Sequence, residues 1–232
     1  MKANDTKIIT ISNQKGGVGK TTSSVNIASY LAASEIPTLI IDMDPQSNTT
    51  SGLGVEVDNN TKSIYDMIIK ESSPDSVIQK TDLEYLDIIP SSTQLVGAEI
   101  ELVSEISREF MLKEALASIK KNYRYVIIDS PPSLGLLTLN VLTASDSVII
   151  PIQCEYYALE GLSQLLNTIR LVQKRLNKNL KIEGILVTMY DSRLNLSKQV
   201  VSELEDYFED KVYKTYIHRN VRLGEAPSHG KP

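Results

Sequence analysis

One glycine-rich stretch constrains this sequence more than any other feature. It reads NQKGGVGKTT, covers residues 13–22, and lies between a β-branched apolar run at residues 7–12 and a helical apolar pattern at residues 20–33. Because glycines have no Cβ atom, the backbone N–H groups of such a loop can turn inward, and the positive end of the following helix points at the same place. The stretch therefore predicts a loop that binds phosphate groups.

The side chains of this loop have distinct expected roles. Lys20 is expected to neutralise the β- and γ-phosphates of a nucleotide, and the Thr21 hydroxyl is expected to bind Mg²⁺. A glycine-rich turn without a ligand is the structural alternative, but it does not explain why two lysines face a nest of amides. The residues that we expect to hold the nucleotide are Lys15, Gly16, Gly17, Val18, Gly19, Lys20, Thr21 and Thr22.

Two acidic residues close the second apolar run. Asp42 and Asp44 are separated by one residue, so their side chains lie on the same side of an extended chain. Two carboxylates near a polyphosphate are costly unless a metal ion or a polarised water lies between them. An Asp-Pro turn explains Pro45 but not both acids. We therefore expect both carboxylates to face the phosphates.

A third acidic residue follows another apolar run. Residues 125–129 read YVIID, and Pro131 and Pro132 come shortly afterwards. The run is typical of a Walker B strand, whose terminal carboxylate holds Mg²⁺ through its water shell. We expect Asp129 to take that role, and we expect the two prolines to restrict the backbone of the loop beside the γ-phosphate.

The apolar periodicity predicts a three-layer α/β fold. Strand-like runs and helical patterns alternate, and the strands rich in Ile and Val are typical of parallel strands that are buried on both faces. We expect a mostly parallel sheet with helices on both faces and ligands beyond the carboxyl ends of the strands. The expected strands are residues 7–12, 38–42, 86–89, 125–129, 147–152, 182–188 and 212–217, and the expected helices are residues 20–33, 108–121, 136–144, 159–176 and 197–208.

Composition excludes several classes of protein. The net charge of −5 argues against a chain that coats nucleic acid with its whole surface, although residues 211–232 hold five basic residues and one acidic residue. The single Cys154 allows no internal disulfide and cannot supply the ligands of an iron–sulfur cluster. No apolar run approaches the roughly 20 residues that cross a bilayer, and the N-terminus lacks a signal peptide. We therefore expect a cytoplasmic protein.

These motifs together resemble those of one family. The general phosphate-loop pattern has glycine where this chain has Gln14, and the string KGGVGKTT from Lys15 onward resembles the deviant Walker A motif of the ParA/MinD ATPases, whose signature residue is the additional lysine. The string DMDPQSN at residues 42–48 is similar to a second motif of ParA proteins. Three further stretches look more like Soj/ParA chromosome-segregation ATPases than like MinD, namely residues 150–161, 188–193 and 219–232.

The resemblance implies a fold, a reaction and partners. It implies a P-loop NTPase of the SIMIBI type that binds ATP and Mg²⁺, hydrolyses ATP slowly without a partner, and forms an ATP-sandwich homodimer. The dimer would bind double-stranded DNA without sequence preference, associate with the nucleoid, and respond to a ParB/Spo0J-like protein, and no membrane partner is expected. A single P-loop ATPase domain would span residues 1–232, without the C-terminal closing segment that relatives carry.

The resemblance also implies catalytic roles for individual residues. Asp44 matches the acid that activates the attacking water, and Asp42 would support Mg²⁺ and its water. Lys15 matches the signature lysine, which reaches across the dimer to the phosphates of the other subunit. Together with Lys20, Lys15 and Asp44 are therefore the expected catalytic residues.

Outside the phosphate motifs, the resemblance implies two further contacts. Arg193 and Arg222 match residues with which the family's dimer binds DNA. Asn220 matches a position near the adenine, although His218 stands where relatives usually have proline. A solvated surface charge is the structural alternative for each arginine.

The sequence leaves two functions open. The first is an ATP-hydrolysing switch for DNA segregation, on a chromosome or a plasmid. The alternative is a ParA/MinD-like positioning ATPase whose cargo is a membrane or a protein assembly, because its chemistry would be identical. Salt-sensitive retention on DNA in the presence of ATP would separate the two.

Overall fold

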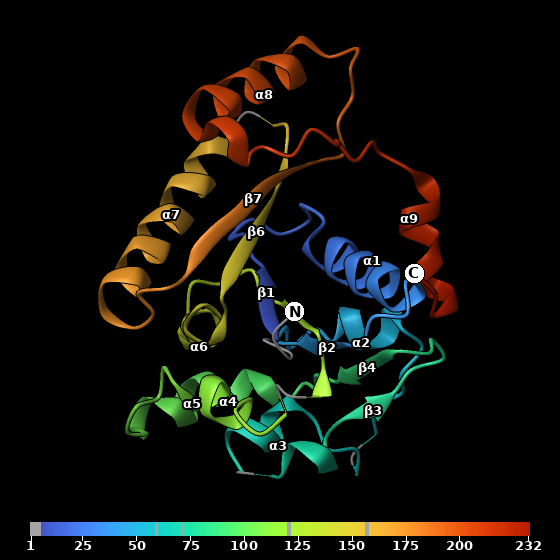
Figure 1. The fold of residues 1–232 in the computed structure, drawn as a ribbon, viewed down its shortest axis with the longest axis vertical. Coiled ribbons are helices and arrows are strands. Elements are labelled where there is room, and N and C mark those ends of the chain that lie inside the picture. The colour runs from blue at the N-terminus through green and yellow to red at the C-terminus, as the bar shows by residue number, and fades with distance from the viewer. Residues whose placement is uncertain (1–5, 59, 71, 120–121, 156–157) are drawn as a thin grey trace, which may run out of the picture.

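The computed structural model of the chain describes residues 6–58, 60–70, 72–119, 122–155 and 158–232. The strands are β1 (Lys7–Ile11), β2 (Thr38–Asp42), β3 (Gln79–Lys80), β4 (Leu86–Ile89), β5 (Tyr125–Asp129), β6 (Ser147–Gln153) and β7 (Lys181–Thr188). Within the described residues they form one seven-stranded sheet in the order β3-β4-β2-β5-β1-β6-β7 (Figure 1). Only the β3–β4 pair is antiparallel among these strands. The mostly parallel sheet expected from the sequence is confirmed.

Helices cover both faces of this sheet. They are α1 (Lys20–Ala33), α2 (Asn48–Gly52), α3 (Ile64–Ile68), α4 (Leu95–Glu101), α5 (Met111–Ala115), α6 (Leu136–Ala144), α7 (Ala158–Arg175), α8 (Asn195–Phe208) and α9 (Val221–Glu225). Short 3₁₀ turns are η1 (Pro74–Ser76), η2 (Leu102–Ser104), η4 (Glu209–Lys211) and η5 (Ala226–His229). None of the helices in the described part of the chain has the length and apolar character that a membrane span needs.

The two helical layers differ in size. On one face, α1 packs through Val25, Ala28 and Ala32, which recur about one helical turn apart and meet apolar side chains of the central strands. On the other face, α3, α4, α5 and α6 pack over β2 and β5, and α7 and α8 continue this layer over β6 and β7. Figure 1 shows α1 on one side of the sheet, with α6 and α7 on the other. The three-layer architecture is therefore confirmed.

The prediction of a strand at residues 212–217 is wrong. In the described structure this segment lies beside β7 and bridges it only at Val212, opposite Ile185. Just beyond the segment, His218 bridges Tyr190, two residues past the end of β7. Tyr213 and Ile217 donate their N–H groups to the β7 carbonyls of residues 185 and 187. The donors are four residues apart and the acceptors two, so the segment bulges and cannot keep a regular ladder. The seventh strand is instead the two-residue β3.

The helix expected at residues 108–121 is shorter than predicted. It is limited to α5, and residues 120–121 lie outside the described residues. The side chain of Asn140 on α6 intervenes at its start, because Nδ2 donates to Arg108 O (2.7 Å) and Oδ1 accepts the N–H of Leu112 (3.1 Å). These backbone groups are thereby satisfied without a helix that begins at residue 108. The other expected strands and helices agree with the structure within two residues.

The strand order brings three carboxyl ends together. β5 lies between β1 and β2, with Ile11 and Asp42 both opposite Asp129. The phosphate loop follows β1 directly, so it leaves the sheet at the same edge as both acids. This convergence is what the expected site requires.

Candidate functional site

The loop between β1 and α1 has the backbone that its glycines predict. Gly17 and Gly19 have φ angles of 73° and 87°, in the left-handed region that favours glycine. A Cβ atom added to Gly16 or Gly17 would meet no described atom within 4 Å, so this side of the loop has room for phosphate oxygens. At the other side, the hydroxyl of Thr188 at the end of β7 donates to Val18 O (2.8 Å) and supports the loop.

The first turn of α1 carries the side chains predicted to act on the nucleotide. Among the described residues no side chain caps this helix, and its first turn contains no acid, so its positive end faces the loop. Lys20 is buried, and its Nζ donates to Lys15 O (3.0 Å). Burial lowers the pKa of Lys20, although the charges of Asp129 and Asp44 oppose the shift. A phosphate bound at the loop would favour the charged ammonium.

Asp129, at the end of β5, is fully buried and accepts hydrogen bonds from three hydroxyls. Thr21 (2.8 Å) and Thr49 (2.7 Å) donate to Oδ2, and Ser24 (3.0 Å) donates to Oδ1. Thr21 and Ser24 are one turn apart on the same face of α1. Burial raises the pKa of Asp129, and the hydroxyls oppose this shift. The structure thus brings Thr21 and Asp129 into contact, as a shared magnesium site requires.

Asp42, at the end of β2, lies opposite Asp129 and is equally buried. Its Oδ2 accepts the N–H (2.9 Å) and the hydroxyl (2.7 Å) of Thr50, and its Oδ1 accepts the N–H of Asp44 (3.1 Å). Burial, followed by the charge of Asp129, raises the pKa of Asp42 to about 7. Two adjacent buried carboxylates repel each other, and a divalent cation would relieve that repulsion.

The oxygen donors of this region fit Mg²⁺. Mg²⁺ is usually held by one or two carboxylates together with substrate phosphates and waters. The described residues accordingly contain no group of three or more His, Cys, Asp or Glu that could hold a metal by themselves, and such a group is not needed. We call the six hydroxyl and carboxylate residues at this edge the carboxylate floor: Thr21, Ser24, Asp42, Thr49, Thr50 and Asp129.

Three hydroxyls of the carboxylate floor escaped the sequence analysis. Ser24 could have been found, because it lies one helical turn after Thr21 on the same face of α1. Thr49 and Thr50 carry no such signal. They reach the acids only because α2 folds back beside the ends of β2 and β5.

Asp44 lies beyond the carboxylate floor, on the loop that follows β2. It is buried, and its Oδ1 accepts the N–H of Gln46 (3.0 Å). It lines a cavity of about 310 Å³ together with Pro131 and Pro132. The loop after β2, expected to face the phosphates, and the loop after β5, expected beside the γ-phosphate, therefore meet at this cavity.

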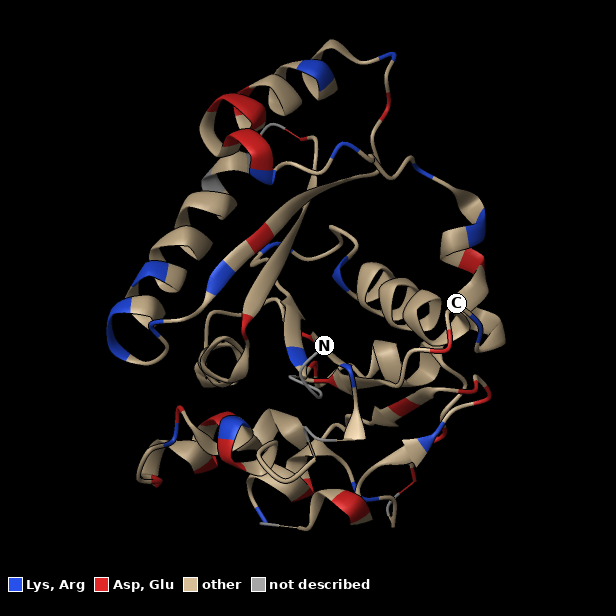
Figure 2. Cartoon of the chain, viewed as in Figure 1, with Lys and Arg blue, Asp and Glu red and all other residues tan. Residues whose placement is uncertain are grey.

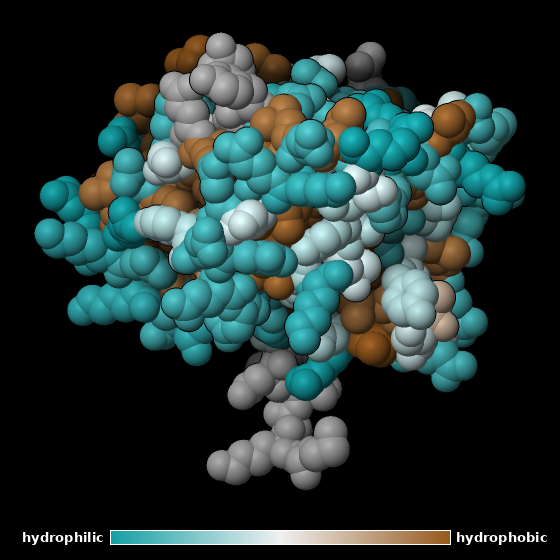
Figure 3. Space-filling view, turned by 90° about the horizontal axis from the view of Figure 1, so that it is seen from above, coloured by the Kyte–Doolittle hydropathy of each residue, from teal (hydrophilic) through white to brown (hydrophobic). Residues whose placement is uncertain are grey.

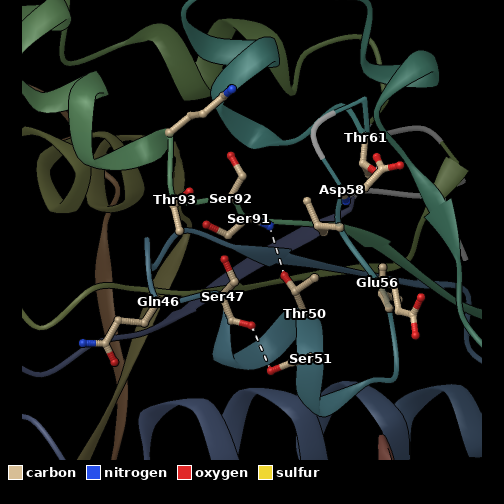
Figure 4. A pocket seen from close by; sticks show the side chains of 13 residues that line it. Gln46, Ser47, Thr50, Ser51, Glu56, Asp58, Thr61, Ser91, Ser92 and Thr93 are labelled. Atoms are coloured by element: carbon tan, nitrogen blue, oxygen red, sulfur yellow. Dashed lines mark hydrogen bonds between the residues drawn. The ribbon is translucent and has the colours of Figure 1, made fainter.

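A larger cavity of about 600 Å³ borders the same loop after β2. Figure 4 shows the hydroxyl side chains of Ser47, Ser92 and Thr93 around it. The hydroxyl of Thr50 donates to Asp42 and accepts the N–H of Ser91 (3.0 Å). Thr50 thus connects the wall of this cavity to the carboxylate floor through hydrogen bonds.

The signature lysine has its charged partner within the same chain. Lys15 Nζ forms an ion pair with Glu155 Oε2, on the segment after β6. The backbone N–H of Lys15 donates to Asn13 Oδ1 (3.0 Å), and Asn13 Nδ2 donates to Pro151 O (2.7 Å). Residues 156–157, within one of the family-like stretches, lie outside the described residues. The outer part of the phosphate loop is therefore attached to the end of β6.

The two arginines expected to bind DNA lie on the surface. Arg193 donates from Nε and Nη2 to the two carboxylate oxygens of Asp191 (2.9 and 2.7 Å), and Arg222 is exposed on α9. Figure 2 shows basic residues along the stretch from α8 to α9, interspersed with acidic ones. Seen from the side that carries α8, the surface is mostly hydrophilic, with apolar side chains in small separate patches (Figure 3).

The segment expected beside the adenine reaches the start of α1. Leu223 and Pro227, on and after α9, line a small cavity with Thr21 and Thr22. Asn220 does not point to a free position in this structure: its Oδ1 accepts the N–H of Arg222 (3.0 Å) and caps α9. The location of the segment fits the expected nucleotide contact, whereas the side chain of Asn220 has a structural role.

Comparisons with known proteins find close similarity over nearly the whole chain. A family model described as AAA domain matches residues 6–182. Sporulation initiation inhibitor protein Soj of Bacillus subtilis is 62% identical over 226 residues, which cover 97% of this chain and 89% of that protein. Chromosome partitioning protein ParA of Myxococcus xanthus is 55% identical over 226 residues, which cover 97% of this chain and 80% of that protein.

A solved structure confirms the fold. The crystal structure of cobyrinic acid a,c-diamide synthase from Mycobacterium smegmatis, with bound ADP and magnesium, has a TM-score of 0.88 at 38% identity and covers 97% of this chain and 92% of that chain. The identity to this synthase is lower than the 62% and 55% found for the two partitioning relatives. Sequence similarity therefore favours the partitioning proteins over the synthase.

Proposed function

The chain belongs to the Soj/ParA family of chromosome-partitioning ATPases, and from this premise we propose that it is an ATP-driven switch for DNA segregation. Mg²⁺ and ATP close a sandwich homodimer, the dimer binds double-stranded DNA without sequence preference on the nucleoid, and a ParB/Spo0J-like protein stimulates hydrolysis and release. The observation that supports this chemistry is the hydrogen bond from the Thr21 hydroxyl to Asp129 (2.8 Å). It joins the phosphate loop to a strand-terminal carboxylate, the pair that a magnesium–nucleotide site uses.

ATP and Mg²⁺ are the cofactors of this switch. The ADP and magnesium bound to the Mycobacterium smegmatis synthase support them, as do the oxygen donors of the carboxylate floor. Thr21 and Asp129 would hold the ion, with Asp42 in support, and the ion would offset the negative charge of the phosphates. The backbone N–H groups of residues 15–22 would bind the phosphates, because left-handed glycines turn such groups inward.

Hydrolysis in the proposed switch depends on two further groups. Asp44 orients the attacking water, a role supported by its burial and by its location on the cavity that the loops after β2 and β5 share. Lys15 completes the site of a second copy by reaching its phosphates. Because a single copy lacks this contribution, its ATPase activity is expected to be slow.

The DNA step is supported by the partitioning relatives and by charge. Five of the six charged residues between positions 211 and 232 are basic, and Arg193 is exposed on the segment before α8. A homodimer doubles this modest surface, so contacts to DNA phosphates add up only in the dimer. Binding of this kind weakens steeply as the salt concentration rises.

DNA co-sedimentation tests the proposal. Wild-type protein, Lys20→Ala and Asp44→Ala are sedimented with DNA in ATP or ADP, at low and moderate salt. We expect retention that needs ATP, persists in Asp44→Ala, and is lost in Lys20→Ala, because the bound state precedes hydrolysis. Lys70→Ala is the matched control, since this exposed lysine contacts two residues of its own helical segment, Asp66 and the ring of Tyr65, in the described structure.

The same experiment separates the proposal from its alternative. A wild-type protein that binds ATP but ignores DNA at every salt concentration contradicts the DNA-segregation switch. It would favour a positioning ATPase with a membrane or protein cargo. Retention that is equal in ATP and ADP contradicts the nucleotide switch itself.

A further inference from the structure

A carboxylate of the same chain holds the lysine that the proposed dimer needs. Lys15 Nζ pairs with Glu155 Oε2, although the two residues are 140 positions apart in sequence. β1 and β6 are parallel neighbours, so the loop after β1 and the segment after β6 leave the sheet at the same edge. The two side chains are 35% and 47% exposed. Lys15 can therefore exchange Glu155 for another anion without opening the core.

The fold of the loop does not depend on this ion pair. Asn13 accepts the backbone N–H of Lys15 (3.0 Å) and donates to Pro151 O (2.7 Å). Asn13 is itself buried, so it attaches the loop backbone to the end of β6 independently of Glu155. The ion pair consequently sets the direction of the Lys15 side chain, whereas Asn13 holds the backbone of the loop in position.

Glu155 also stands apart from the carboxylate floor. The acids whose charges act on Lys20 are Asp129 and Asp44, whereas the acid that contacts Lys15 is Glu155. The two lysines of one loop thus face different acids. A role in magnesium binding or in water activation does not account for Glu155, because its described partner is the lysine.

We propose that Glu155 is a positioning residue that holds Lys15 within its own protomer until ATP-dependent dimerisation. The proposal rests on the homodimer described above, in which Lys15 moves to the phosphates of the second copy. This movement takes the Lys15 ammonium away from Glu155, so dimerisation breaks the internal pair. Each half-exposed pair is weak and contributes roughly twofold to fivefold to the equilibrium constant. A symmetric dimer breaks two such pairs, so their loss raises the dissociation constant of the dimer by about fourfold to 25-fold.

Analytical ultracentrifugation tests this exchange. The dissociation constant of the dimer is measured with Mg²⁺ and a non-hydrolysable ATP analogue for wild type, Glu155→Gln, Lys15→Gln and the double variant. Glu183→Gln is the matched control, because Glu183 forms a comparably exposed pair with Lys7 (2.6 Å) on a different pair of strands. Thermal unfolding without nucleotide checks that each variant folds.

The expected result is a dissociation constant about fourfold to 25-fold lower in Glu155→Gln, because both protomers lose the pair, with no change in Glu183→Gln. In the Lys15→Gln background, Glu155→Gln should have no effect, because the partner of the carboxylate is already absent. A dimer that is weaker or unchanged in Glu155→Gln overturns the inference, as does a gain that persists without Lys15. A wild-type protein that binds the analogue yet stays monomeric overturns the proposed function instead, and the exchange with it.

Discussion

The carboxylate floor and the charged rim of the site are built on opposite principles. Asp42 and Asp129 are fully buried. They accept hydrogen bonds from hydroxyl and amide groups of residues on α1 and α2. We call the Lys15–Glu155 and Arg193–Asp191 ion pairs the charged rim. In contrast to the floor, these pairs are partly or largely exposed. In the proposed function, groups of the floor are preorganised for a ligand, whereas those of the rim exchange one partner for another.

This difference determines how each region responds to change. Water does not reach the buried acids of the carboxylate floor, so it cannot compensate for a charge that a substitution removes. Substitutions there should have large effects on activity and on stability. At the rim, water and salt screen the charges, and exposed pairs contribute little to stability. The comparison therefore predicts a steep decrease in mutational effect from floor to rim.

Asp129→Asn should produce the largest effect. Loss of the charge that we propose to hold Mg²⁺ is expected to lower Mg²⁺-dependent ATP turnover on the order of 100-fold. The melting temperature without nucleotide should rise, because the repulsion between Asp129 and Asp42 is removed. ATPase assays and thermal unfolding measure the two changes.

A buried aspartate elsewhere in the sheet serves as the control for this variant. Asp87 on β4 accepts hydrogen bonds from Lys80 Nζ (2.9 Å) and the Tyr123 hydroxyl (2.7 Å). Asp87→Asn should lower the melting temperature, because it removes an attraction rather than a repulsion. If Asp129→Asn keeps its ATPase activity within a few-fold of wild type, the assignment of the floor to Mg²⁺ is wrong.

The pH dependence of stability sharpens the comparison further. The folded pKa of Asp42, about 7, lies above its ordinary value of 3.8, so the folded state binds this proton more tightly than the unfolded state. Protonation of Asp42 therefore stabilises the folded state. This contribution to the free energy of unfolding is complete below pH 3.8 and is lost as the pH rises through 7. One pKa unit corresponds to about 1.4 kcal/mol, or a shift of roughly 2–4 °C in melting temperature.

Melting curves without nucleotide or Mg²⁺ between pH 5 and about 8 check this expectation. Wild type should lose stability relative to Asp42→Asn as the pH rises, because the amide does not titrate. Parallel pH profiles for the two proteins would show that Asp42 is ionised throughout this range. Addition of Mg²⁺ should stabilise wild type more at the upper end of the range, where the carboxylates are charged.

The smallest expected effect lies at the rim. Arg193 holds the pKa of Asp191 down at about 2, so this acid is ionised at neutral pH. In the proposed function, it competes with DNA phosphates for the arginine. Asp191→Asn should raise ATP-dependent DNA retention by roughly twofold to fivefold per subunit and steepen its salt dependence by about one counterion per subunit. Arg193→Ala should do the reverse.

Retention assays over a salt series measure both rim variants. Arg170→Ala is a suitable control, because this arginine on α7 contacts the Tyr207 hydroxyl (3.3 Å) away from the segment that carries Arg193. Unchanged retention in both Asp191→Asn and Arg193→Ala would remove Arg193 from the DNA surface.

The sequence predicted most of the core but not its edges. Apolar runs predicted the six strands of four or more residues that the described part of the chain contains, since strands buried on both faces need continuous apolar residues. The failure at residues 212–217 has a specific cause: the spacing of Tyr213 and Ile217 does not match that of their acceptors on β7. Alternation of apolar and polar residues in the sequence does not show whether the backbone donors of a segment will match the acceptors of the strand beside it. Edge elements such as β3 are too short to show a period at all.

By itself the sequence determined the phosphate loop, the acids at the strand ends and the family, because each of these is carried by a contiguous stretch. Only the tertiary structure brought Thr49 to Asp129 and Glu155 to Lys15, which are separated by 80 and 140 positions. Such contacts depend on which strands become neighbours, and that order is set by the packing of the whole sheet. Local patterns report which residues a strand buries, whereas the sheet decides which side chains meet at its edge.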